Sequence, residues 1–566
     1  SAADFAESVE RMRGTLRVII QRGRLQCPKN LPKIAAVLDQ FVVEQDYDEE
    51  QESWHPKLAL VGYKGPGDER AWRLWIGSRN LTRSRDLDLG LLIDGEAKRR
   101  KGTRPLPGVA QIGRRLAALS GLADFPPDAV SAELEPLCWR APDDIALDSI
   151  ALHERGSAAT TPLPMGAVER VVAVSPFLCP GFVTTMAGWG DADTRRDLVT
   201  TLAAVRGLSL KAKRALKPFR LLALAPPQAE QDDALALPTG NPDPSPQAQA
   251  TEAQAAAAPA DNSDAEPVPV SLHAKLFAFS QKKTTRVVMG SANATARAWS
   301  GRNAEAVVTF DAGPLILTGI EALIGSAMPI PREILDEPAT SDDDEPAAQL
   351  DRCRAKLVAG WPLSLTRTLD HFVLQAGSAP MLGHRGIRLE AGLATGALVP
   401  WPDGKQTLVL GEVPLAWQTD LLQLRLVLGD ASCAWLQRAP VDPPIAADRD
   451  RAAIGRFLGV RAFYAWMRGL LDGDLGTPDN ESWEHHQGDE RAPLHGRHGL
   501  DDLTLEDILT AWTRDEIAFR RTDARFETYL AAILAHDETL LPEDRRALEA
   551  LRGIWGAARQ ALLEKR

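Results

Sequence analysis

The stretches Trp54-His55-Pro56-Lys57 and Leu272-His273-Ala274-Lys275 are two copies of one short pattern. In each copy two apolar runs follow the lysine, and the pattern closes on Gly-Ser-x-Asn, at 77–80 and at 290–293. We predict strands over 58–63 and 72–76 in the first copy, and over 275–279 and 286–289 in the second. Recurrence of the whole ordered pattern predicts two similar lobes, one around each copy.

A β-hairpin places the His-x-Lys end of one strand beside the turn that follows its partner strand. One phosphate group can then contact the whole set. Imidazole offers a nitrogen nucleophile or a proton, lysine offers a positive charge, and serine and asparagine side chains donate hydrogen bonds to phosphate oxygens. The candidate catalytic residues are His55, Lys57, Asn80, His273, Lys275 and Asn293, with Ser78 and Ser291 as supporting donors.

These residues resemble the two motifs of the phospholipase D superfamily, in which pseudo-symmetric lobes bring two such motifs to one active site. The resemblance covers residues 4–332. The aspartate that usually follows the lysine in that family is replaced here by Gly62 and Ser280. This departure is similar to the tyrosyl-DNA phosphodiesterase and bacterial phospholipase D-like nuclease branch, which keeps histidine, lysine and asparagine.

The resemblance implies chemistry through a phosphohistidine, with no metal and no cofactor. It implies His55 as the nucleophile and His273 as the acid and base. Because the two copies are nearly symmetric, the reverse assignment is also chemically sensible. Trapping the covalent adduct in each single histidine variant distinguishes the two assignments.

Two acids follow the Gly-Ser-x-Asn turns. Asn303-Ala304-Glu305 matches an Asn-x-Glu that the family often carries there, and Asp86-Leu87-Asp88 is the looser counterpart. A carboxylate on the second imidazole nitrogen fixes the tautomer and stabilises the imidazolium. Glu305 and Asp88 are therefore candidate histidine-orienting acids, and the alternative for each is an ordinary solvated acid beside a strand.

Composition limits the classes of function. The chain has 566 residues, 44% of them hydrophobic, and a net charge of −12, which argues against a generally basic nucleic-acid coat. Two local basic clusters are candidate nucleic-acid-binding sites or, alternatively, solvated loop and helix faces. The first holds Lys98, Arg99, Arg100 and Lys101, and the second holds Lys211, Lys213 and Arg214.

Cysteine usage and hydropathy bear on location. The five cysteines are scattered without any Cys-x-x-Cys spacing, which is typical of a reducing cytoplasm. No signal peptide opens the chain and no run of about 20 apolar residues occurs, so we expect a cytoplasmic protein that does not bind a membrane. A strand over 170–175 precedes the first helix of the second lobe, whereas none precedes the helix expected at Asp4, so we expect the natural chain to extend upstream of Ser1.

We expect a mixed α/β chain of four parts: two pseudo-symmetric phospholipase D-like α-β-α lobes over 1–165 and 166–335, a small β-rich domain over 355–440, and an α-helical domain over 445–566. The helical part includes candidate helices over 505–519 and 526–535. Residues 226–267 are a low-complexity insertion that we expect to be disordered. Four histidines at 485, 486, 495 and 498 fit no standard zinc spacing, which favours a mobile loop over a metal site.

The leading interpretation is a metal-independent phosphodiesterase or nuclease acting on single- or double-stranded DNA. The two C-terminal domains imply, by analogy with bacterial nucleases, the docking of a helicase or another subunit, as in anti-phage defence systems. One alternative is a phospholipid-processing phospholipase D or phosphatidyltransferase. Another is a nucleic-acid-binding scaffold subunit that is active only in an assembly.

Overall fold

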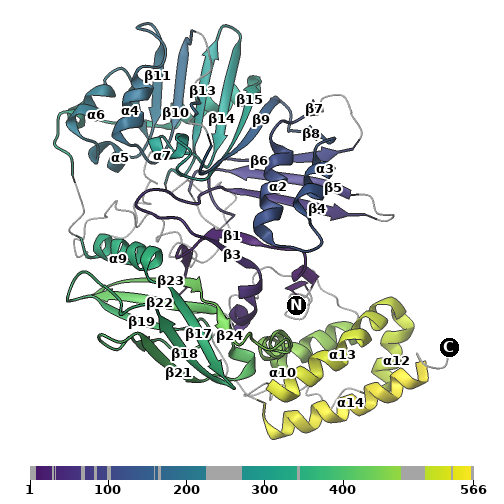
Figure 1. Ribbon diagram of the computed structural model, residues 1–566. Coiled ribbons are helices and arrows are strands. Elements are labelled where there is room, and N and C mark those ends of the chain that lie inside the picture. The colour runs from purple at the N-terminus through teal and green to yellow at the C-terminus, as the bar shows by residue number, and fades with distance from the viewer. Residues whose placement is uncertain are drawn as a thin grey trace, which may run out of the picture.

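The computed structural model describes residues 8–9, 11–28, 31, 33–65, 70–81, 86–97, 104–157, 160–162, 167–224, 271–340, 345–472, 504–536 and 540–562. It is a mixed α/β structure, 35% helix and 31% strand, with several sheets and a helical C-terminal region. Figure 1 shows two sheets in the upper part of the molecule, a β-rich part below them and the C-terminal helices at the lower right.

The first motif lies on a sheet with the strand order β4-β5-β6-β8-β7. The strands are β4 (Leu58–Lys64), β5 (Arg70–Gly77), β6 (Gly90–Glu96), β7 (Arg104–Pro105) and β8 (Cys138–Arg140), with helices α2 (Val109–Ser120) and α3 (Pro127–Leu134). Strands β4 and β5 confirm the hairpin expected from the sequence. Their antiparallel register pairs Leu58 with Ile76, which brings the end of the His-x-Lys segment to Gly77.

The second motif lies on a larger sheet with the order β16-β12-β11-β10-β13-β14-β15-β9. Its strands are β9 (Ile145–His153), β10 (Arg170–Val174), β11 (Arg195–Val199), β12 (Arg220–Ala223), β13 (Leu276–Gln281), β14 (Thr284–Gly290), β15 (Glu305–Ala312) and β16 (Met328–Pro329). Strands β13 and β14 confirm the second expected hairpin. Its helical segments are α4 (Pro180–Ala187), α5 (Leu202–Arg206), α6 (Leu210–Ala215), α7 (Ala296–Trp299), α8 (Pro314–Ser326) and η5 (Arg332–Leu335).

Strand β9 crosses from the first lobe to the second. It follows β8 in the chain, yet it pairs antiparallel with β15 at the edge of the second sheet. Its inward side chains Leu147 and Ile150 enter a hydrophobic core to which both sheets contribute, among others Leu74 from β5 and Val172 from β10. The second sheet therefore begins before the boundary that the sequence placed at residue 165, and the two lobes pack on a common core.

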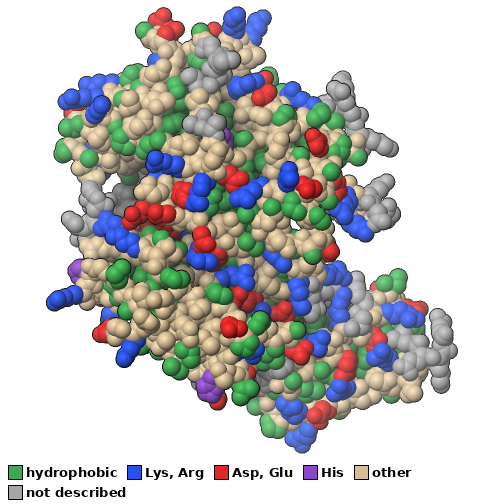
Figure 2. All heavy atoms as spheres, in the orientation of Figure 1, with side chains coloured by type: hydrophobic (Ala, Val, Ile, Leu, Met, Phe, Trp, Pro, Cys, Tyr) green, Lys and Arg blue, Asp and Glu red, His purple; other side chains and the backbone are tan. Residues whose placement is uncertain are grey.

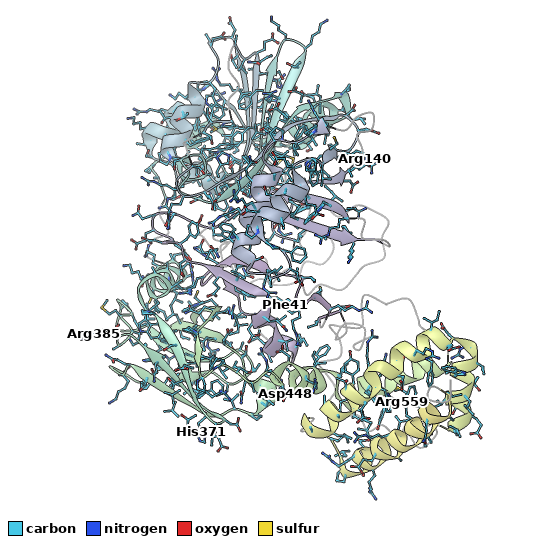
Figure 3. The ribbon with its side chains drawn as sticks, turned by 45° about the vertical axis from the view of Figure 1, so that its right-hand side comes forward. Phe41, Arg140, His371, Arg385, Asp448 and Arg559 are labelled. Carbon is cyan, nitrogen blue, oxygen red and sulfur yellow. The ribbon has the colours of Figure 1, made fainter. Side chains whose placement is uncertain are left out.

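The N-terminal segment also departs from the expected division, which assigned it to the first lobe. Strands β1 (Val18–Gln21) and β3 (Val42–Gln45) form their own parallel pair, and β2 (Leu25–Gln26) adds to the β-rich domain by pairing with β23 (Ala431–Arg438). Helix η1 (Lys33–Gln40) and Phe41 pack into the core of the C-terminal helices. Figure 3 shows Phe41 between the sheet that carries Arg140 and the C-terminal helices, which are marked by Asp448, directly before the first of them, and by Arg559.

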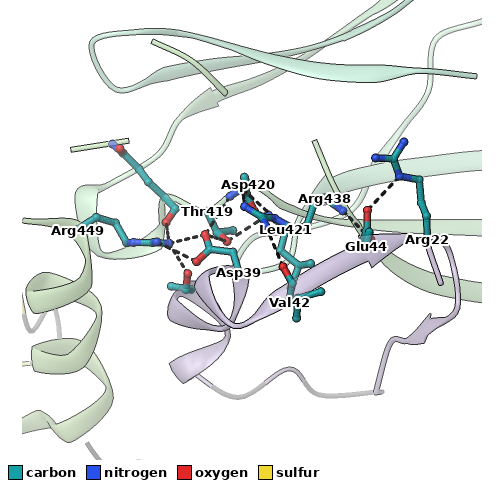
Figure 4. Close-up of polar contacts among 11 residues, drawn as sticks. Arg22, Asp39, Val42, Glu44, Thr419, Asp420, Leu421, Arg438 and Arg449 are labelled. Carbon is teal, nitrogen blue, oxygen red and sulfur yellow. Dashed lines mark hydrogen bonds and ion pairs between the residues drawn. The ribbon is translucent and has the colours of Figure 1, made fainter. Parts of the chain in front are cut away.

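A buried polar cluster fixes this segment to the C-terminal parts (Figure 4). The Asp39 carboxylate accepts hydrogen bonds from both terminal nitrogens of Arg449, at 2.8 and 2.9 Å, and from Thr419 Oγ1 at 2.8 Å. Glu44 accepts from Arg22 Nε and from the backbone N–H of Arg438, each at 3.1 Å. Burial raises the pKa of Glu44 to about 7, against the opposing effect of those two partners.

The β-rich domain has two sheets, with orders β21-β18-β17-β24 and β2-β23-β22-β19-β20. Its remaining elements are α9 (Pro346–Gly360), β17 (Leu363–Thr368), β18 (His371–Ala376), β19 (Arg388–Leu393), β20 (Val399–Pro400), β21 (Thr407–Glu412), η6 (Leu415–Trp417), β22 (Leu421–Leu428) and β24 (Val441–Asp442). Alternation along β22 points Leu422, Leu424 and Leu426 into the core, as the sequence pattern predicts. Helix α9 covers that core through Leu350 and Leu357.

The C-terminal helices are α10 (Arg449–Asp472), α12 (Leu505–Arg514), α13 (Glu516–His536) and α14 (Pro542–Leu562). The expected helix over 505–519 is instead interrupted at Asp515, whose backbone (φ −148°, ψ 88°) leaves the helical region while its N–H closes on Ala511 O. Helix α13 then runs unbroken through 526–535. The insertion at 226–267 and the four histidines at 485–498 lie outside the described residues. In the described chain no helix is long and apolar enough to cross a membrane.

Candidate active site

Each His-x-Lys segment starts against a strand of the other lobe. The backbone N–H of His55 donates to Ala304 O at 3.0 Å, directly before β15. The backbone N–H of His273 donates to Leu87 O at 2.8 Å, shortly before β6. Both contacts belong to short parallel bridges, and they occupy equivalent places in the two halves. The two motifs are thus brought together by a crossed, nearly two-fold arrangement.

The two Gly-Ser turns repeat one hydrogen-bond pattern. Ser78 exchanges backbone and side-chain hydrogen bonds with Leu89, at 2.8 Å each. Ser291 exchanges the same pair with Ala306, at 2.9 Å each. Both serines are 0% exposed, and their role as supporting donors to a phosphate stays a prediction. Their hydroxyl oxygens fix each turn to the following strand, because a buried backbone N–H needs an acceptor.

A carboxylate orients the first histidine. His55 Nδ1 lies 3.1 Å from Glu305 Oε2, which also accepts a hydrogen bond from the Ser291 hydroxyl. Glu305 Oε1 accepts from Asn303 Nδ2 at 3.3 Å, and the Glu305 side chain is 1% exposed. Since a carboxylate only accepts, the Nδ1 proton is on His55, and the lone pair of Nε2 faces Lys57 Nζ at 2.8 Å.

His55 is a neutral base at pH 7. Burial, followed by the nearby positive charge of Lys57, lowers its pKa from 6.5 to about 4, and Glu305 opposes that shift. A neutral imidazole retains the Nε2 lone pair that a nucleophile needs. The environment of His55 therefore keeps this nitrogen chemically competent at neutral pH.

The second histidine contacts the turn of the first motif. His273 Nδ1 lies 3.2 Å from Ser78 O and 3.1 Å from Lys275 Nζ. Lys275 Nζ, on a side chain that is almost wholly buried, also donates to Ser78 O at 2.9 Å and to His273 O at 2.8 Å. Asp88, the acid expected to orient this histidine, is exposed, and a backbone carbonyl takes its place. The two halves therefore differ in the charge that faces each imidazole.

The two asparagines lie in unequal surroundings. Asn293 is half-buried, with Oδ1 3.4 Å from Ser175 Oγ and its backbone carbonyl bonded to Trp299 Nε1 at 3.0 Å. Asn80 is exposed at the end of the first turn. Asn293 is thus fixed within the second lobe beside the site, whereas Asn80 is accessible at its surface.

Two buried residues near the site were not singled out from the sequence. Arg79, inside the first Gly-Ser-x-Asn, is 2% exposed. The second copy has Ala292 at the same position, so the charged residue in the first copy was the sequence signal that could have identified Arg79. His153 pairs with Glu305 in the register of β9 and β15, and burial lowers its pKa. No sequence signal identified His153, because its strand crosses between lobes.

The two basic clusters have different outcomes. Residues 98–103, with Lys98, Arg99, Arg100 and Lys101, lie outside the described residues. In the second cluster Lys213 is fully buried and donates to Glu337 O and Pro338 O, so it does not belong to a surface that binds phosphate. Lys211 and Arg214 are exposed on α6, at the outer edge of the second lobe in Figure 1. Figure 2 shows acidic and basic side chains interspersed over the face in view.

Within the described ranges, no group of three or more histidine, cysteine or acidic side chains is arranged to hold a metal ion. No protein-family model matches the chain, and no curated protein matches it. The geometry of the two motifs thus carries the functional inference.

Proposed function

We propose that this chain is a phosphodiesterase of the phospholipase D type that cleaves DNA through a phosphohistidine, within two pseudo-symmetric lobes. The observation that carries the proposal is the crossed pair of histidine–lysine motifs. His55 contacts Glu305 of the second lobe, and His273 contacts Ser78 of the first. One phosphodiester between the two imidazoles would meet a nucleophile on one side and a proton donor on the other.

In the first step the Nε2 lone pair of His55 attacks phosphorus. The P–N bond forms as the bond from phosphorus to the leaving oxygen breaks, and that oxygen takes a proton from Nε2 of His273. His273 enters this step as the imidazolium, with Nδ1 donating to Ser78 O, 3.2 Å away, and it becomes neutral when Nε2 gives up its proton. Lys57, which contacts His55 Nε2 without substrate, would move its hydrogen bond to a phosphoryl oxygen.

In the second step the now neutral His273 accepts a proton from water, and the water oxygen attacks phosphorus. The P–N bond breaks and its electron pair returns to His55 Nε2. Lys275 and Asn293 would help to hold the phosphoryl oxygens, as would Asn80 at the surface. Imidazole supplies both the nucleophile and the proton, so every atom in this cycle comes from the chain, substrate or water.

The unequal partners of the two histidines favour His55 as the nucleophile. Once Nε2 bonds to phosphorus while Nδ1 keeps its proton, the ring carries a positive charge. The Glu305 carboxylate, 3.1 Å from Nδ1, stabilises that charge. His273 Nδ1 lies beside the Ser78 carbonyl and Lys275 Nζ instead, and the carbonyl can accept the Nδ1 proton while Nε2 gives and accepts another.

The test is cleavage of labelled single-stranded DNA, double-stranded DNA, RNA and phosphatidylcholine in EDTA. We expect DNA cleavage that survives EDTA, and a loss of several orders of magnitude, at least about 10²-fold, in His55→Ala and in His273→Ala. His371→Ala, which removes an exposed histidine on β18, is the matched control and should retain full activity.

Cleavage of phosphatidylcholine alone would identify a phospholipase and contradict the proposal. Cleavage that EDTA abolishes and Mg²⁺ restores would contradict the histidine chemistry. DNA binding by the purified chain without cleavage, together with cleavage only after a cell extract is added, would identify a subunit that works within an assembly.

A further inference from the structure

The chain leaves β10 through the turn 175–177, which borders the candidate active site. The antiparallel register of β10 and β13 pairs Val174 with Leu276, so the turn starts next to the His-x-Lys of the second motif. Ser175 Oγ lies 3.4 Å from Asn293 Oδ1, and it accepts a hydrogen bond from the backbone N–H of Ala294 at 2.9 Å. Groups presented by this turn are therefore adjacent to the phosphate-binding asparagine of the proposed mechanism.

Hydroxyl groups hold each backbone carbonyl of the turn. Thr200 Oγ1 donates to Ser175 O at 2.8 Å, and Thr201 Oγ1 donates to Pro176 O at 3.2 Å. Ser175 Oγ lies 2.7 Å from Phe177 O, which accepts its proton. Because all three carbonyls are held, and proline fixes φ in the middle of the turn, the support beneath Phe177 is rigid.

The Phe177 side chain lies partly in solvent. It is 38% exposed, although the β10 residues that precede the turn are buried. Single exposed apolar side chains are common on protein surfaces. Phe177 differs from Tyr63, an exposed aromatic residue on β4, because it combines a rigid support with a place on the turn that contacts Asn293 and Ala294. An aromatic face held in this way is suited to stack on a flat group of a bound molecule.

We infer that Phe177 is a specificity-determining residue whose ring stacks on a nucleobase next to the scissile phosphate. The inference rests on the proposed function, because it requires that the site bind a nucleic-acid phosphodiester. A base inside a duplex is already stacked on its neighbours, so the substrate class that fits this platform is a single strand. Stacking on an aromatic side chain changes affinity by about 5- to 150-fold per base.

The experiment compares two single-stranded oligonucleotides of equal length. One carries all its bases, and the other has tetrahydrofuran residues in place of the nucleosides that flank the cleaved phosphate. We expect Phe177→Ala to raise KM about 5- to 150-fold for the first oligonucleotide only, with kcat nearly unchanged. Phe177→Trp should keep the wild-type KM, because it keeps an aromatic face, and Tyr63→Ala is the matched control for loss of an exposed ring.

A binding measurement separates failure of this inference from failure of the proposed function. In the His55→Ala background, fluorescence anisotropy should show weaker binding of the base-bearing oligonucleotide when Phe177→Ala is added. Unchanged affinity and unchanged KM would overturn the stacking role, even if DNA cleavage is intact. An equal loss on both oligonucleotides would also overturn it, since that result indicates damage to the turn. If Phe177→Ala weakens binding of the base-bearing oligonucleotide but the wild-type chain does not cleave DNA, the proposed function is contradicted and the stacking role is kept.

Discussion

Glu305 and Asp88 occupy equivalent positions in two nearly symmetric halves, yet their surroundings differ. Glu305 is buried and contacts His55, Ser291 and Asn303, whereas Asp88 is exposed. The sequence indicated both as candidates, since each follows a Gly-Ser-x-Asn turn, and the expected histidine contact is present at Glu305. The sequence could not show which of the two acids contacts a histidine, because the surroundings of each acid depend on how the other lobe packs against it.

We predict that Glu305→Gln lowers kcat by about 10²- to 10⁴-fold, while Asp88→Asn, the matched control, changes it by less than about threefold. His55 has a pKa of about 4, below its ordinary 6.5, and must be neutral to attack phosphorus, so the acid-side decline of wild-type kcat/KM should be centred near pH 4. The carboxylate raises this pKa, so Glu305→Gln should move the decline to still lower pH. Equal effects of the two substitutions, or a decline centred near 6.5, would contradict the role of Glu305.

At the scale of elements, local pattern predicted the two hairpins but not their neighbours. Strands β4, β5, β13 and β14 follow from apolar runs between turn residues, which is local information. The pairing of β9 with β15 joins residues about 150 positions apart, and alternation in β9 fits either sheet equally well. The break at Asp515 was also missed, because helical periodicity continues on both sides of it.

Strand β3 carries an element-scale prediction through Glu44. Its pKa is raised to about 7 from 4.5, so the folded state favours the protonated form. The contribution of Glu44 protonation to the free energy of unfolding is fully present below pH 4.5 and is lost as pH rises through 7. Glu44→Gln should therefore raise Tm at pH 8, by about 1 °C for each kcal/mol gained in a chain of this length, and change it little at pH 5. Glu412→Gln, at an exposed acid, is the control for differential scanning calorimetry.

A lower Tm of Glu44→Gln at pH 8 would contradict this prediction. It would show that the pairing of Glu44 with Arg22 stabilises the fold more than burial of the carboxylate destabilises it.

At the scale of the whole molecule, the N-terminal segment joins parts that are distant in sequence. Hydrophobic periodicity predicted a mixed α/β chain with a β-rich part and a helical end, and the structure is mixed α/β with several sheets and a helical C-terminal region. The sequence assigned residues 1–45 to the first lobe because they precede its motif. Gln21 and Ile19 do accept hydrogen bonds from Trp54 of the first motif, but other residues of the segment pack on α10 and on strands of the β-rich domain. The buried partners Asp39 and Arg449 lie 410 positions apart in the sequence. Partners at such separations leave no local pattern.

Asp39→Ala should weaken this junction by about 3–5 kcal/mol, because it removes the carboxylate that contacts both terminal nitrogens of the buried Arg449 and leaves the ion pair of Arg449 Nε with Asp450. We expect faster hydrogen exchange in η1 and in the first turns of α10. Asp39→Ala combined with Arg449→Met should restore part of the protection, since the buried guanidinium is removed. Exchange rates equal to those of the wild type would contradict the role of this pair in holding the N-terminal segment.

The most direct measurement of the central claim is to trap the covalent intermediate. The His273→Ala chain is mixed with a labelled single-stranded oligonucleotide in EDTA, quenched at alkaline pH where phosphohistidine survives, and digested for mass spectrometry. The crossed site predicts a nucleotide adduct on His55 of this chain. The adduct should be absent when His55→Ala is added to His273→Ala, and it should be retained when His371→Ala is added instead. An adduct on His273 of the His55→Ala chain alone would reverse the assigned roles. No adduct on either histidine, with cleavage that requires a divalent metal, would contradict the account.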